Sequence, residues 1–219
     1  MKKKCLKPCS VLILYFGFFI FPFSVLAQQQ EKLIKKVYFD NGLLAAGKES
    51  GGFSSLEFIL KNKWSASVSF CGMGLEPKEL PDDYEAAWGL VILPFENNLY
   101  NDLKIISVSA GKYIPAGKKA WFTMEAGPSF IQGQRYRFTR NPDYVPGQAE
   151  YAILGFYYPS NYNHVSEKTK TMGAVIKADF TWAFASFMGI GIGGVASLNS
   201  IQSFGAFQVK LSVGWMNRK

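Results

Sequence analysis

The chain has 219 residues, with 24 basic and 16 acidic side chains and a single histidine. Four of the lysines and none of the acids lie in the first 27 residues, so the remainder is only mildly basic, which argues against a nucleic-acid-binding protein. Only one cysteine, Cys71, follows residue 27, which excludes a disulfide framework and a cysteine metal site. We therefore expect no nucleic-acid partner, no metal and no cofactor.

The first 27 residues have the three parts of a secretory signal peptide. The lysines at 2, 3, 4 and 7 form a positive start, residues 11–26 are apolar, and Val25-Leu26-Ala27 is a small-residue cleavage site. A membrane anchor is the alternative, but this apolar run is interrupted by Pro22 and is short for a helical span of ~20 residues. The sequence predicts a signal peptide over 1–27 and one exported domain over 28–219.

Eight strand-like runs follow in the exported part. Most of them alternate apolar with polar or small residues, which is typical of strands with two different environments, whereas in the first run Val37, Tyr38 and Phe39 are adjacent. They lie at 35–45, 53–60, 64–75, 100–113, 119–131, 172–183, 187–197 and 204–216. Short links alternate with long ones, which is the plan of outer-membrane barrels. The long links are 46–52, 76–99, 132–171 and 198–203. The expected fold is all-β, an eight-stranded antiparallel up-and-down transmembrane β-barrel.

The first strand has an alternative position. The apolar run from Trp88 to Leu93, within 85–93, could replace 35–45 in the count of eight. With that choice, the first turns would lie on the opposite side of the membrane. The regular alternation of short and long links favours 35–45.

Polar residues opposite the apolar face decide which face is the interior. The expected interior polar network consists of Glu57, Glu125, Lys177, Asp179, Gln208 and Lys210. An eight-stranded barrel is just wide enough for side chains to fill it, so acids and bases pointing inward can pair and no open pore remains. The apolar face then meets lipid, and aromatic residues near strand ends fit the two membrane interfaces. The alternative is a soluble periplasmic lipocalin-like barrel with an apolar interior that binds an apolar ligand.

Several segments, in this order, carry a resemblance to a known group. They are the Ala27/Gln28 junction, the run from Asn101 to Tyr113, Glu125-Ala126-Gly127-Pro128-Ser129, and Gly189 to Ser200. The chain resembles the small eight-stranded outer-membrane barrels, such as OmpX and the OmpA membrane domain, and more narrowly the uncharacterised barrels of Bacteroidetes-type bacteria. The resemblance implies the outer membrane of a Gram-negative cell, with lipid, lipopolysaccharide and the barrel-assembly machinery as partners. It supplies no catalytic motif, and the chain ends in Trp215-Met216-Asn217-Arg218-Lys219 rather than on a terminal aromatic residue.

The longest external loop, 132–171, is rich in arginine and tyrosine, which are favoured at contact sites. The candidate contact residues are Arg135, Tyr136, Arg137, Arg140, Tyr144, Tyr157 and Tyr158. They predict a surface that binds an extracellular protein, a glycan or lipopolysaccharide phosphate. The alternative is a strand extension above the membrane that packs on itself.

An enzymatic role would need a catalytic group. A lipid A acyl hydrolase or transferase could use His164 with Ser160 or Ser166, and Glu167 could orient the imidazole. A polar loop tip is a poor place to exclude water, so we expect no enzymatic activity.

Overall fold

The computed structural model describes residues 34–90, 94–96, 99–152 and 155–216. The predicted signal peptide lies outside these described residues. Within them, no helix is long and apolar enough to cross a membrane.

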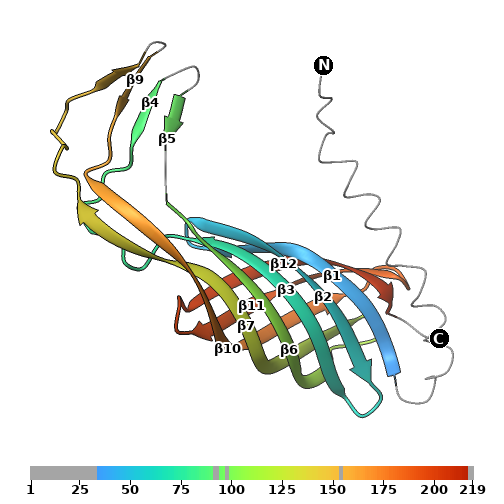
Figure 1. Ribbon diagram of the computed structural model, residues 1–219. Coiled ribbons are helices and arrows are strands. Elements are labelled where there is room, and N and C mark those ends of the chain that lie inside the picture. The colour runs from blue at the N-terminus through green and yellow to red at the C-terminus, as the bar shows by residue number, and fades with distance from the viewer. Residues whose placement is uncertain (1–33, 91–93, 97–98, 153–154, 217–219) are drawn as a thin grey trace, which may run out of the picture.

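Eight strands close into a barrel, each antiparallel to its neighbours (Figure 1). The strands are β1 (Ile34–Ala46), β2 (Glu49–Leu60), β3 (Trp64–Leu75), β6 (Asn101–Pro115), β7 (Ala120–Arg140), β10 (Tyr162–Trp182), β11 (Met188–Asn199) and β12 (Phe204–Trp215). Their order around the ring is their order in the chain, and pairs such as Phe39 with Val213 close it between β1 and β12. The predicted eight-stranded up-and-down barrel is confirmed.

The structure decides between the two positions for the first strand. Residues 34–46 form β1, which pairs with both β12 and β2. Trp88–Leu90 forms the short strand β4, which belongs to a separate sheet. The run of three bulky residues Val37-Tyr38-Phe39 is compatible with a strand because Val37 and Phe39 face out while Tyr38 is buried.

One link is shorter than the sequence predicts. The sequence predicts a loop over 46–52, but β1 and β2 are joined by Gly47 and Lys48 alone. Gly47 has a φ of 65°, the left-handed conformation that such a turn uses. The polar, Gly-bearing residues 49–52 continue the ladder of β2, and a Cβ on Gly51 would lie 2.2 Å from the Gly72 carbonyl oxygen. The glycine is therefore a close strand contact and not a loop residue.

The stretch 132–171 is largely strand. β7 and β10 pair without interruption from Ala120–Trp182 to Arg140–Tyr162, so the hairpin continues beyond the barrel wall. At its tip stands a second sheet, with the order β5-β4-β9-β8 (Figure 1). Its strands are β4, β5 (Pro94–Glu96), β8 (Glu150–Ala152) and β9 (Gly155–Tyr158). This segment is thus largely an extension of the barrel strands, which is the alternative given in the sequence analysis.

The outer surface of the barrel is apolar and the inner surface polar. Outward-facing Phe70, Ile106, Val108, Ile176 and Ile192 are about half exposed, whereas Ser67, Ser109, Glu125 and Lys177 on alternate positions are buried. A barrel in water buries its apolar face, so this inverted distribution is that of a barrel surrounded by lipid.

Val108 lies mid-strand on this outer face, so Val108→Arg puts a charge at the centre of the apolar belt. In a bilayer we expect the substitution to lower the free energy of unfolding by about 2–4 kcal/mol. Urea unfolding of the protein in lipid vesicles measures the change. Val145→Arg, in the exposed external segment, is the matched control and leaves stability nearly unchanged. Equal effects of the two substitutions would contradict a lipid-facing wall.

Candidate functional site

The barrel interior has three layers. At the end where the short turns lie, a buried cluster fills it with Tyr38, Ile59, Tyr113, Trp121, Ala183 and Met216. At the opposite end, a second buried cluster contains Leu44, Met73, Leu75, Leu103, Ile105, Ile131, Ile201 and Ala206. Charged and polar side chains occupy the space between the clusters. Both ends of the polar layer are therefore closed by apolar side chains.

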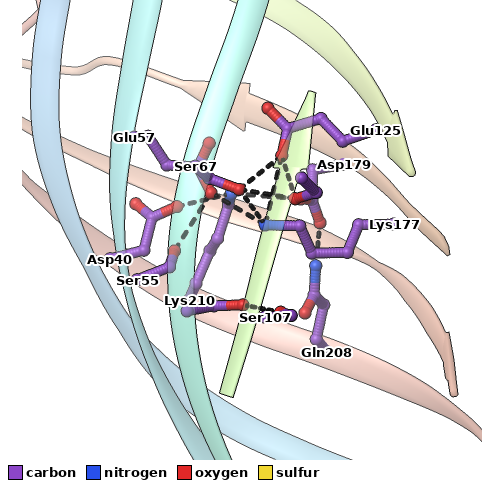
Figure 2. Close-up of polar contacts among 12 residues, drawn as sticks. Asp40, Ser55, Glu57, Ser67, Ser107, Glu125, Lys177, Asp179, Gln208 and Lys210 are labelled. Carbon is purple, nitrogen blue, oxygen red and sulfur yellow. Dashed lines mark hydrogen bonds and ion pairs between the residues drawn. The ribbon is translucent and has the colours of Figure 1, made fainter. Parts of the chain in front are cut away.

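Lys177 of β10 lies between two carboxylates (Figure 2). Its Nζ is 3.2 Å from Glu57 Oε1 on β2 and 3.2 Å from Glu125 Oε2 on β7. Nζ also donates to Ser67 Oγ at 2.6 Å, and Ser67 and Ser109 lie 2.6 and 2.9 Å from Glu125 Oε2. Three elements of the wall are thus joined through one ammonium group, with hydroxyls as additional donors.

Lys210 of β12 is held in the same manner. Its Nζ is 2.7 Å from Asp40 Oδ2 on β1 and 3.4 Å from Asp179 Oδ2 on β10. The Gln208 amide donates to Asp179 Oδ1 (Figure 2). The Lys210 side chain is buried, so the carboxylates take the place of the water molecules that would otherwise solvate its ammonium group.

All six residues predicted for the interior polar network are buried in this layer. Sequence reasoning missed Asp40, which is paired with Lys210, and the serines that donate to Glu57 and Glu125. Asp40 is two residues from Tyr38, so both side chains lie on the same side of the strand. The adjacent bulky residues around Tyr38 conceal in the sequence that this side faces inward.

Two of the three predicted contact residues at the base of the external hairpin, Arg135 and Tyr136, bind the chain itself. Arg135 Nη2 donates to the Ser200 carbonyl oxygen at 3.1 Å, over the mouth of the barrel. The Tyr136 hydroxyl is 2.9 Å from the Tyr100 carbonyl oxygen and the side chain is buried. Arg137 makes no ion pair or side-chain hydrogen bond with another described residue, and it is exposed.

Asp83 binds side chains of the last residue pair of the β7–β10 ladder. Arg140 and the Tyr162 hydroxyl donate to its carboxylate at 2.9 and 2.8 Å. Nearby, the Tyr144 hydroxyl donates to the Glu85 carboxylate, and this hydrogen bond raises the pKa of Tyr144. Segment 76–87 is thereby attached to the hairpin.

The sheet at the tip has an aromatic face. Trp88 of β4 stacks on Tyr158 of β9 at a centroid separation of 4.6 Å, and Phe156 meets Trp88 edge-on. Trp88, Leu90 and Tyr151 are 50%, 46% and 88% exposed. Tyr157 faces the other way and donates to the Glu150 carboxylate. Of the predicted contact residues, Tyr158 therefore lies on the exposed aromatic face, while Arg140, Tyr144 and Tyr157 serve internal contacts.

The residues considered for catalysis form no hydrogen bond with one another within the described part of the chain, although Ser166 lies on the same side of β10 as His164. His164 lies among rings, with centroids 5.8 Å from Tyr136 and 6.3 Å from Phe138. Glu167 is an odd number of residues from His164 on the same strand, so it faces the opposite side of β10. Ser160 accepts a hydrogen bond from the Tyr162 backbone NH. The described residues also contain no group of three or more His, Cys, Asp or Glu placed to hold a metal ion.

No family model and no curated protein matches the chain. Among solved structures, the chain is similar to Ail, the attachment invasion locus protein of Yersinia pestis, with 12% identity, 84% of this chain and 95% of that one covered, and a TM-score of 0.40. It is also similar to the N-terminal β-barrel domain of Pseudomonas aeruginosa OprF, with 10% identity, 83% and 98% covered, and a TM-score of 0.45. Neisserial surface protein A gives 9% identity, 83% and 96% covered, and a TM-score of 0.44.

Replacing Lys210 with methionine leaves Asp40 and Asp179 buried without their shared cation. We expect Lys210→Met to lower the free energy of unfolding by about 3–5 kcal/mol, because uncompensated charges remain inside. Adding Asp40→Asn restores part of the loss, since one of the two carboxylates is then neutral. Thermal and urea unfolding measure both variants, with exposed Lys170→Met as the control.

Unchanged stability of the Lys210→Met protein would contradict an ion-paired interior. The apolar clusters at both ends are intact in this variant, so its conductance across a planar bilayer equals that of the wild type.

Proposed function

We propose that this protein is a non-enzymatic β-barrel of the outer membrane of a Gram-negative cell. The barrel is a scaffold with a filled interior and no open pore, and its external hairpin and sheet form a contact surface. The observation that carries the proposal is the combination of an apolar outer wall with a charged interior closed at both ends.

The filled interior argues against two other functions. A soluble lipocalin-like barrel needs an apolar cavity for its ligand, whereas this interior holds two lysines and four carboxylates in its middle layer. A pore needs a continuous aqueous path, whereas apolar clusters lie on both sides of the polar layer. Without an assembled Ser-His-acid group at His164, lipid A hydrolysis or acyl transfer has no support in the geometry either.

The contact surface is the aromatic face of the external sheet. Exposed apolar residues that adjoin one another are typical of interaction sites, and tryptophan and tyrosine carry much of the energy in such contacts. Trp88, Leu90, Tyr151 and Tyr158 make up this face, and Arg137 lies exposed on the hairpin below. We propose an extracellular protein or glycan as its partner.

Further features rest on the sequence alone. Four of them stay predictions: the signal peptide over 1–27, recognition by the barrel-assembly machinery, contact with lipopolysaccharide and the Bacteroidetes-type origin.

The membrane location and sidedness can be tested with single cysteines. Val145→Cys in the external segment should react with a membrane-impermeant maleimide on intact cells, and Lys118→Cys in a short turn should react only after permeabilisation. Both positions are exposed in the fold. The native Cys71 lies on a barrel strand, and the unmodified protein serves as the background control.

Recovery of the protein in the soluble periplasmic fraction would contradict the proposal. Labelling of Lys118→Cys but not Val145→Cys on intact cells would reverse the proposed orientation.

The contact surface can be tested by removing its apolar groups. We expect the triple variant Trp88→Ser, Leu90→Ser and Tyr151→Ser to lose retention on surfaces coated with extracellular-matrix proteins or glycans. The barrel of this variant should still fold, as judged by the mobility difference between boiled and unboiled samples on a detergent gel. Val165→Ser, at an exposed apolar position on the hairpin outside the sheet, is the control. Equal retention of the wild type and the triple variant would remove the sheet as a contact surface.

A further inference from the structure

The charges of the described residues are separated along the barrel axis. The end that carries the short turns has seven lysines and no acid in residues 34–37, 58–66, 111–122, 181–190 and 213–216. The lysines are Lys35, Lys36, Lys61, Lys63, Lys112, Lys118 and Lys119. Every described acid is either in the interior layer or at the opposite end, where Glu49, Asp83, Asp102 and Glu167 are examples. Among the described residues, the charged side chains of the short-turn end are therefore all basic.

The basic residues occupy one side of this end. They belong to the start of β1, the β2–β3 turn, the end of β6 and the β6–β7 turn, and these strands are consecutive in the ring. The other side, formed by the β10–β11 turn and β12, presents exposed aromatic side chains instead. These are Trp182, Phe184, Phe187 and Trp215. We call the exposed lysines 35, 61, 63, 112, 118 and 119 the basic arc.

The arc lies at the depth of the membrane interface. Lys112 continues the outward-facing row of Ile106 and Val108, and its Nζ is 3.9 Å from the centroid of the Trp64 ring. Trp64 is itself outward-facing and half exposed, at the position of an interfacial tryptophan. An ammonium group above such a ring is at the level where a bilayer has its headgroups. None of the six arc lysines forms an ion pair within the described residues.

We propose that the basic arc binds the phosphate groups of anionic phospholipids in the leaflet that surrounds the short-turn end. This inference rests on the proposed function, because it needs the barrel to span a membrane. Clustered lysines beside a membrane-spanning segment attract anionic lipid, and no described acid lies among these lysines to weaken the effect. The contact between Lys112 and Trp64 favours a lipid headgroup over an acidic protein, because it places the charge at the lipid-facing wall and not on the turns alone.

The test compares lipid selectivity of matched variants. The protein is extracted from membranes and reconstituted in phosphatidylcholine vesicles with a trace of spin-labelled phosphatidylglycerol or phosphatidylcholine. Electron spin resonance then gives the fraction of each label that the protein immobilises. The arc variant carries Lys61→Gln, Lys112→Gln, Lys118→Gln and Lys119→Gln. The control carries Lys78→Gln, Lys104→Gln, Lys168→Gln and Lys170→Gln, four exposed lysines at the other end with the same change in net charge.

We expect the wild type and the control to immobilise phosphatidylglycerol in preference to phosphatidylcholine. In the arc variant, the ratio of the two immobilised fractions should fall by about five-fold or more. The wild-type preference should also fall when the salt is raised to about 0.5 M, because the headgroup contact is screened. Unchanged preference in the arc variant, or equal losses in both variants, overturns the inference while leaving the barrel in the membrane. Failure of the wild type to immobilise any lipid overturns the proposed function as well.

Each variant is first examined on a detergent gel with and without boiling. Lys63 is left unchanged because it has a φ of 66°, and all four substituted arc positions are exposed, so the fold of the variant is retained. An effect of the arc variant that persists at high salt would also overturn a charge-based contact.

Discussion

The constraint on which the structure depends is that strands in hydrocarbon must pair all their backbone groups with one another. The ring meets it by joining β1 to β12, so that the barrel strands leave no open edge within the wall. Closure also fixes two surfaces, because successive side chains point alternately in and out. Once the outer surface is apolar, every polar residue of the wall must find its partners inside.

For the charged side chains, the interior meets this requirement with few groups. Lys177 and Lys210 each lie between two carboxylates, and the four carboxylates come from four different strands, β1, β2, β7 and β10. Each lysine is therefore a cross-link between segments far apart in the chain. Buried ion pairs contribute little net stability relative to apolar packing, but a missing partner is costly, so they select one register of the ring. The apolar clusters above and below exclude water from these pairs and strengthen them.

The sequence was sufficient for the strand count, the order and the direction of most faces, because period-two alternation is clear in the wall strands other than β1, where Val37, Tyr38 and Phe39 are adjacent. Lys177 and Asp179 were assigned to the interior from their places among Ile176, Ala178 and Phe180, and they lie there. Three features were not accessible from alternation. Asp40 stands beside bulky neighbours in the sequence. Residues 49–52 resemble a loop in composition, and only the close approach of Gly51 to the backbone of β3 marks a strand there. The pairing of β4 with β9 joins segments some seventy residues apart and has no local signal.

The uninterrupted ladder of β7 and β10 has a mechanical consequence. A strand needs only about ten residues to cross a bilayer, yet both members of this hairpin run for 21 residues. The surplus, at about 3.4 Å per residue, is a stiff arm of the order of 30 Å that is one piece with the wall. Asp83, through Arg140 and Tyr162, ties a third segment to its side. The tip sheet is thus held at a set distance from the barrel wall, and a force applied to it would be transmitted along the continuous ladder to the barrel.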